Sequence, residues 1–278
     1  MRFGVLGPLQ VGGGESVVTA NRDRTVLAVL LLNANKVVPV DDLVDAVWEA
    51  KPPATARGQL QTCVSRLRRL LSSVGVPGDT IVTAPAGYRV VLGPDDLDAQ
   101  VFERMVAEAR AAAAARRWAT ARETYRAALA LWRGPALAGL SGEAIRRGAA
   151  FLDEQRMLAL EERFEVELRI GGTGDLIAEL TDLVERHPLR ERLRGQLMRA
   201  LADSGRRAEA LAVFRTGREI LHAELGIEPG AALRAIHRRL LAGEDTGEEI
   251  ADRLPEGESG GRPPGGESAD RVAEGDPG

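Results

Sequence analysis

Three helical segments lie between short apolar runs and a β-hairpin in the first 93 residues of the chain. Apolar runs interrupted by glycines predict a small β-meander over the first 20 residues. The helical segments are residues 24–33, 41–49 and 54–72, and the hairpin strands are residues 81–83 and 88–91. Pro52 and Pro53 make a tight break between the second and third helices. This order predicts a winged helix-turn-helix with an N-terminal sheet.

The second half of the chain is helical throughout, from residue 98 to about residue 243. Residues 117–126 and 206–215 both carry arginine, two alanines, an aromatic ring and arginine at the same offsets, and a weaker copy begins at Gly174. Such patterns resemble tetratricopeptide repeats, whose period is about 34 residues. The predicted fold class is therefore mainly α with a small β component: an N-terminal winged helix-turn-helix plus an all-α, tetratricopeptide-like repeat domain. The alternative is an alanine-rich bundle whose repeats arise from composition.

The net charge of −4 is unevenly distributed along the chain. Residues 1–93 hold 10 basic and 7 acidic residues, a balance of +3, and residues 94–243 hold 24 and 23, a balance of +1. Residues 244–278 hold 3 basic and 11 acidic residues, a balance of −8. An acidic chain argues against a nucleic-acid partner, but here the acidity lies in the last segment. We expect domains over 1–93 and 94–243 and a disordered acidic tail over 244–278.

The third helix separates an apolar stripe from a polar face that has no carboxylate. Its core stripe is Leu60, Cys63, Val64, Leu67, Leu70 and Leu71. Short polar side chains and Gly58 allow close approach to a DNA groove, where glutamine and arginine contact base edges and phosphates. The expected DNA contacts of this recognition helix are Thr55, Arg57, Gln59, Thr62, Ser65, Arg66, Arg68 and Arg69. The alternative is an ordinary basic face exposed to solvent.

The hairpin that follows is expected to act as the wing. Thr83, Tyr88 and Arg89 are its candidate DNA contacts, and Gly87 is expected to supply backbone freedom at the turn. Packing into the domain core is an equal alternative for Tyr88. Arg24 and its neighbour Arg22 are candidate phosphate contacts at the start of the first helix.

The sequence argues against catalysis, a cofactor and a metal site. The three histidines are dispersed without metal-ligand spacing. The segment around Ser141 falls short of a nucleophile elbow because Glu143 occupies the position of the last glycine. The single cysteine, Cys63, cannot form an intrachain disulfide, and its place on the apolar stripe predicts a small core residue. We therefore expect no catalytic residues, no cofactor and no metal.

The chain shows neither a secretory signal nor a membrane span. The first residues lack a sustained apolar core, and the longest compact apolar run, residues 26–32, is far shorter than the roughly 20 residues needed to cross a bilayer. We therefore expect a cytoplasmic protein with no membrane partner.

Several motifs resemble a known family of regulators. Residues 64–71, with Gly87, Tyr88 and Arg89 in the hairpin, resemble the DNA-binding domain of the OmpR family. The start, residues 3–9, resembles the SARP family, the streptomycete antibiotic regulatory proteins. Motifs of the bacterial transcriptional activation domain are matched by residues 131–137, 187–191 and 225–230. The resemblance covers roughly residues 2–242, and the absence of a Gly-x-x-x-x-Gly-Lys motif is typical of a small, stand-alone member.

The resemblance implies a sequence-specific transcription activator. Such proteins bind promoter DNA at direct repeats near the −35 element, as a homodimer or a side-by-side pair. They recruit RNA polymerase holoenzyme through its sigma factor and other subunits, and they act at the nucleoid. Their targets are typically biosynthetic gene clusters for antibiotics and other secondary metabolites.

A helical-repeat scaffold without specific DNA binding is the alternative function. The carboxylate-free face of the third helix favours the DNA-binding interpretation over the scaffold. Replacement of Arg66 and Arg69 by alanine is therefore expected to abolish promoter binding and to leave the fold intact. Removal of residues 94–243 is expected to leave weak DNA binding and no activation.

Overall fold

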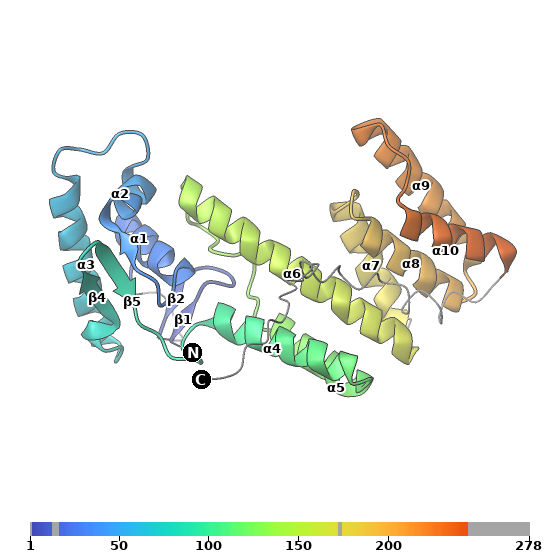
Figure 1. Ribbon diagram of the computed structural model, residues 1–278, viewed down its shortest axis with the longest axis horizontal. Coiled ribbons are helices and arrows are strands. Elements are labelled where there is room, and N and C mark those ends of the chain that lie inside the picture. Colours follow the sequence, from blue (N-terminus) through green and yellow to red (C-terminus); the bar gives the residue numbers. More distant parts are fainter. Residues whose placement is uncertain (1, 13–16, 172–173, 244–278) are drawn as a thin grey trace, which may run out of the picture.

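The computed structural model describes residues 2–12, 17–171 and 174–243, so the expected tail over 244–278 lies outside the described residues. The N-terminal part contains the expected three helices and hairpin (Figure 1). Its elements are β1 (Phe3–Gly4), β2 (Gln10–Val11), α1 (Asn21–Leu32), β3 (Val38–Pro39), α2 (Val40–Trp48), α3 (Ala56–Ser73), a 3-10 turn (Gly78–Thr80), β4 (Ile81–Ala84) and β5 (Gly87–Val90). The winged helix-turn-helix prediction is confirmed.

Two small antiparallel sheets replace the expected meander and simple hairpin. β1 pairs with β2, whereas the apolar run at residues 17–18 forms no strand. β3 joins the hairpin to make a sheet of order β3-β5-β4, in which Val38 lies opposite Tyr88. β3 was missed because two residues are too few to show an alternating pattern.

The remaining described residues form helical hairpins. They are α4 (Asp98–Ala114), α5 (Trp118–Leu129), α6 (Glu143–Ile170), α7 (Gly174–Arg186), α8 (Glu191–Asp203), α9 (Arg207–Leu225) and α10 (Ala231–Ala242). The 28-residue α6 runs through the middle of the molecule, from the winged domain at one end to α7–α10 at the other (Figure 1). The all-α prediction for this half is confirmed.

The sequence repeats occupy equivalent places in three successive hairpins. Arg117 and Arg206 precede the second helices, α5 and α9, and the weaker copy opens α7 at Gly174. The alanine and the aromatic residue of each strong copy are buried: Ala121 and Tyr125 in one, Ala210 and Phe214 in the other. These positions pack each hairpin against its neighbour, so the repeats reflect structure rather than composition.

The hydrophobic cores do not divide at residue 93. One core extends from the winged domain through α4 and α5 into α6. A second core joins the later part of α6 to α7–α10, beginning at Met157. α4 and α5 therefore pack as part of the first core, and a fragment that ends at residue 93 would expose apolar surface that the full chain buries.

A buried carboxylate fastens the N-terminal segment to the helical region. Asp98, which opens α4, accepts the backbone N–H groups of Val5 at 2.8 Å and Leu6 at 3.1 Å. Arg133 donates to Asp98 at 2.8 Å and to the carbonyl of Pro8 at 3.1 Å. The backbone N–H of Arg133 also donates to the carbonyl of Leu6. We call these contacts of Asp98 and Arg133 with residues 5–8 the clamp. They give the motif at residues 131–137 a structural role, because Arg133 belongs to it.

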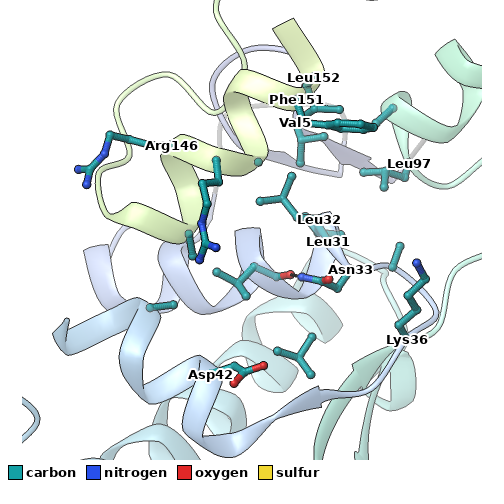
Figure 2. Close-up of a pocket in the computed structure, with 18 of the residues that line it drawn as sticks. Val5, Leu31, Leu32, Asn33, Lys36, Asp42, Leu97, Arg146, Phe151 and Leu152 are labelled. Carbon is teal, nitrogen blue, oxygen red and sulfur yellow. Dashed lines mark hydrogen bonds between the residues drawn. The ribbon is translucent and has the colours of Figure 1, made fainter. Parts of the chain in front are cut away.

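A cavity of about 1350 Å³ lies where the winged domain meets the helices (Figure 2). Leu32 from α1 and Phe151 from α6 line it, and Phe151 is 64% exposed. A Cβ added at Gly148 would come within 2.3 Å of the Leu32 side chain, so α6 crosses α1 in close contact at the edge of this cavity. No helix among the described residues has the length and apolarity needed to cross a membrane.

Candidate nucleic-acid interface

Helix α3 forms as its pattern predicts, with one face in the core and one in solvent. Its buried residues are Ala56, Leu60, Cys63, Val64, Leu67 and Leu71. We define the recognition face as Thr55, Arg57, Gln59, Thr62, Ser65, Arg66 and Arg69, which are exposed or partly exposed. The helix begins after Thr55 rather than at Ala54, because residues 53–56 form a turn in which the N–H of Ala56 donates to the carbonyl of Pro53.

Arg66 on this face is bound to a buried acid from α1. Its Nη2 donates to Oδ1 of Asp23 at 2.6 Å, and its Nε donates to Oδ2. The Asp23 side chain is 1% exposed, whereas that of Arg66 is 42% exposed. Arg66 therefore neutralises Asp23 and fixes α3 against α1, while one edge of the guanidinium reaches solvent.

Cys63 lies below this pair. Burial, together with a hydrogen bond to Asp23, raises the pKa of its thiol to about 11. The thiol therefore stays protonated near neutral pH. Cys63 behaves as a core residue and not as a reactive thiolate.

A second link between α1 and α3 lies nearer to the start of α3. Arg22 donates to Oε1 of Gln59 at 2.8 Å, and Nε2 of Gln59 donates to Thr55 at 2.9 Å. The guanidinium of Arg22 also lies 5.3 Å from the ring centre of Trp48 in α2. Gln59 is thus held in one orientation by neighbours on both sides, an arrangement suited to base recognition.

The other residues of the recognition face are more open. Arg57 pairs with Asp41 at 2.7 Å, but both side chains are about 70% exposed, so the pair is weak. Thr62 donates to the carbonyl of Gly58. Within the described residues, the side chains of Ser65 and Arg69 have no hydrogen bond or ion pair, and a Cβ at Gly58 would meet no atom within 4 Å. Arg69 therefore presents a guanidinium to solvent without a side-chain partner among the described residues.

Two expected DNA contacts, Arg68 and Thr83, bind each other. Arg68 donates to the carbonyl of Ile81 at 2.9 Å and to Oγ1 of Thr83 at 2.9 Å. Arg68 thereby fixes the β4–β5 hairpin to α3, so it acts as a residue that positions the hairpin.

The structure favours the core alternative for Tyr88 and revises the role expected for Gly87. Tyr88 is 7% exposed and belongs to the hydrophobic core, which favours the packing alternative over DNA contact. Gly87 does not have a positive φ; instead, a Cβ there would lie 1.9 Å from the carbonyl oxygen of Val38. Glycine is needed for the close approach of β5 to β3, not for an unusual turn. Arg89 remains partly exposed on β5.

Arg24 lies apart from the recognition face. Its guanidinium is the nearest group, at 3.8 Å, to a Cβ placed at Gly139 in the loop before α6. Arg24 therefore lies at the junction with the helical region, whereas Arg22 faces α3. The sequence pattern of α3 did not reveal the acidic partners Asp23 and Asp41, because these residues lie in α1 and α2.

Comparisons with known proteins match both halves of the chain. Residues 14–90 match the family described as "Transcriptional regulatory protein, C terminal", and residues 97–241 match "Bacterial transcriptional activator domain". Regulatory protein DnrI of Streptomyces peucetius is 36% identical over 268 residues, covering 93% of this chain and 98% of DnrI. Regulatory protein AfsR of Streptomyces griseus is 36% identical over 253 residues, 90% of this chain but 25% of AfsR.

A solved structure has the same arrangement. Mycobacterium tuberculosis EmbR, determined in complex with a low affinity phosphopeptide, is similar with a TM-score of 0.84 and 37% identity. The match covers 87% of this chain and 65% of that chain. These relatives are named as regulatory proteins, not as enzymes. The two family matches and the near-complete coverage of DnrI place this chain in the SARP family of transcriptional regulators.

Proposed function

We propose that this chain is a transcription activator that binds direct repeats near the −35 element of its target promoters. Two copies bind side by side or as a homodimer at the nucleoid and recruit RNA polymerase holoenzyme through its sigma factor and other subunits. Residues 1–93 serve DNA binding and residues 94–243 serve activation. The identity to DnrI supports a regulator of this class, and the targets we propose are antibiotic or other secondary-metabolite genes.

The recognition face carries this proposal. Over the length of α3 it offers short polar side chains, an orientated Gln59 and an open Arg69, with no acidic residue in the helix. Such a surface matches the hydrogen-bonding edges and phosphates of a major groove. The hairpin fixed by Arg68 lies beside it, where a wing would reach the adjacent backbone.

The experiment is selection of genomic fragments by the full chain, followed by sequencing and gel shift at fixed salt. Arg69→Ala and Ser65→Ala remove open side chains from the recognition face, so each is expected to weaken specific binding about tenfold or more. Arg146→Ala, an exposed arginine at the start of α6, is the matched control and should retain binding.

The outcome separates the two functions. Selection of fragments that share a direct repeat, with loss in Arg69→Ala but not in Arg146→Ala, supports the activator. Equal, weak binding to all fragments by the full chain and all three variants would overturn the activator proposal in favour of a helical-repeat scaffold. Recruitment is tested separately by transcription in vitro from a selected promoter with purified polymerase holoenzyme, where the full chain should raise transcript yield.

A further inference from the structure

A second, smaller hollow of about 410 Å³ opens in the helical region between α4, α5, α6 and the start of α8. Four arginines line it: Arg110, Arg116, Arg169 and Arg192. Helix α3 lies at the left in Figure 1, well apart from the connection between α4 and α5. The hollow is therefore separate from the recognition face and plays no part in the proposed DNA binding.

The guanidinium groups around the hollow are only partly engaged. Arg110 uses its Nε for both oxygens of Glu162, at 3.1 and 2.9 Å. Arg192 approaches Glu161 no nearer than 3.7 Å, and that acid is already bound by Arg190 at 3.1 Å. The side chain of Arg116 has no hydrogen bond or ion pair within the part of the chain described. Several N–H donors thus remain for a ligand.

Tyr125 and Arg110 share one carboxylate at this hollow. Its hydroxyl lies 3.1 Å from a carboxylate oxygen of Glu162. Burial raises the pKa of Tyr125. The charge and the hydrogen bond of Glu162 raise this pKa further, whereas the charges of Arg110 and Arg192 lower it. Arg110 and Tyr125 thus meet at the Glu162 carboxylate, and Arg192 lines the same hollow.

Aromatic and apolar surface completes the site. The guanidinium carbon of Arg169 lies 5.1 Å from the centre of the Trp118 ring, and Nε of Arg169 lies 3.4 Å from Glu165. Ala113, Ala114 and Val166 line the hollow between the charged groups. Small side chains in that position leave room for one or two side chains of a bound segment.

We propose that this hollow binds an acidic peptide segment of a partner protein, with a carboxylate held by Arg110, Arg116 and Arg192. Guanidinium groups bind carboxylates through paired hydrogen bonds, and three of them, from α4, the turn after it and α8, can enclose one. Glu162 and Glu165 also line the hollow. They tolerate a single carboxylate between arginines but repel the continuous charge of a nucleic-acid backbone, which favours a peptide.

The test measures fluorescence anisotropy of a labelled oligoglutamate peptide with the full chain at physiological ionic strength. Arg192→Gln removes one cation, and Glu161 keeps its bond to Arg190. Arg116→Asn removes another at a left-handed position, φ 55°, that asparagine tolerates. Arg146→Gln at the far end of α6 is the charge-matched control. Thermal unfolding of each variant verifies the fold.

The expected result is saturable binding that falls at least tenfold in Arg192→Gln and in Arg116→Asn and stays within about twofold in Arg146→Gln. An oligoglutamine peptide should not bind. The proposal is overturned if no variant-sensitive binding occurs, if Arg146→Gln weakens binding as much, or if oligothymidylate binds more tightly with the same dependence. It is also overturned if binding appears only after the five acidic residues at positions 244–252 are replaced by amides, since this chain would then be its own ligand.

Discussion

Arg66 and Asp23 form the closest link between α3 and α1, and this pair gives Arg66 a structural role within the recognition face. The acid is 1% exposed and accepts from two nitrogens of the guanidinium. Asp23 therefore depends on Arg66 for its partner in the core. Effects of substitutions on DNA binding and on stability cannot be separated at Arg66, although they can be at Arg69.

The first prediction concerns the different effects of replacing Arg66 and Arg69 on stability. Arg66→Ala leaves a buried charge without its partner, so we expect the free energy of unfolding to fall by about 3–5 kcal/mol. Arg69→Ala should change it by less than about 0.5 kcal/mol, because Arg69 is exposed. Urea unfolding of both variants checks this. The expectation that both replacements leave the fold intact is thus revised for Arg66, and equal stability of the two variants would contradict the structural role.

The second prediction concerns the clamp at Asp98. Asp98→Ala removes the acceptor of the Val5 and Leu6 N–H groups and the partner of Arg133. We expect a loss of about 3–5 kcal/mol, measured by urea unfolding. Asp95→Ala is the control, since its pair with Arg104 is exposed and should contribute less than about 1 kcal/mol. A small effect at Asp98 would show that the core alone fastens the N-terminal segment.

The third prediction contrasts two glycines of the winged domain. Gly87→Ala forces a Cβ toward the Val38 carbonyl, so we expect a loss of about 1–3 kcal/mol or more from overpacking. Gly58→Ala meets open space inside α3 and should raise stability by about 0.5–1 kcal/mol. Thermal unfolding measures both. If Gly58 lies against DNA, gel shift should also show weaker binding by the more stable Gly58→Ala variant, a combination that improved folding alone does not explain.

The fourth prediction is a pH dependence in the last hairpin. His237 stacks on Phe214 with ring centres 3.8 Å apart, and burial, with Arg215, lowers the pKa of His237. The unfolded chain therefore takes up this proton at higher pH than the folded chain does. The stability contributed by the neutral imidazole is present above about pH 6.5 and declines as the pH falls below it.

Urea midpoints between pH 7 and pH 5 test this pH dependence. His237→Phe retains the stack without the titrating group, so its midpoint should fall less than that of the parent chain. His222→Gln, on α9, is the control and should behave as the parent does. An identical pH profile for the parent and His237→Phe would refute the assignment.

The sequence correctly predicted those features of the fold that depend on residues close together in the chain. The periodicity over 54–72 identified α3 and its buried stripe, and the repeated aromatic at Tyr125 and Phe214 identified equivalent hairpins. Pairings across distant segments were not accessible, because a face pattern does not say which polar residue another helix will bind. Asp23 with Arg66 and Asp98 with Arg133 are such pairs. Burial of Tyr88 depended on β3, which is too short to recognise.

The clamp has a consequence for how proteins of this kind are assembled from parts. Val5 and Leu6 accept hydrogen bonds from the backbone of Leu137 and Arg133, and Asp98 holds the same segment from the other side. A gene fusion that joined residues 1–93 to an unrelated module would separate this segment from both partners. Recombination that preserves folding should therefore transfer the winged domain together with at least residues 94–137, and exchange is expected further along α6, beyond the first core.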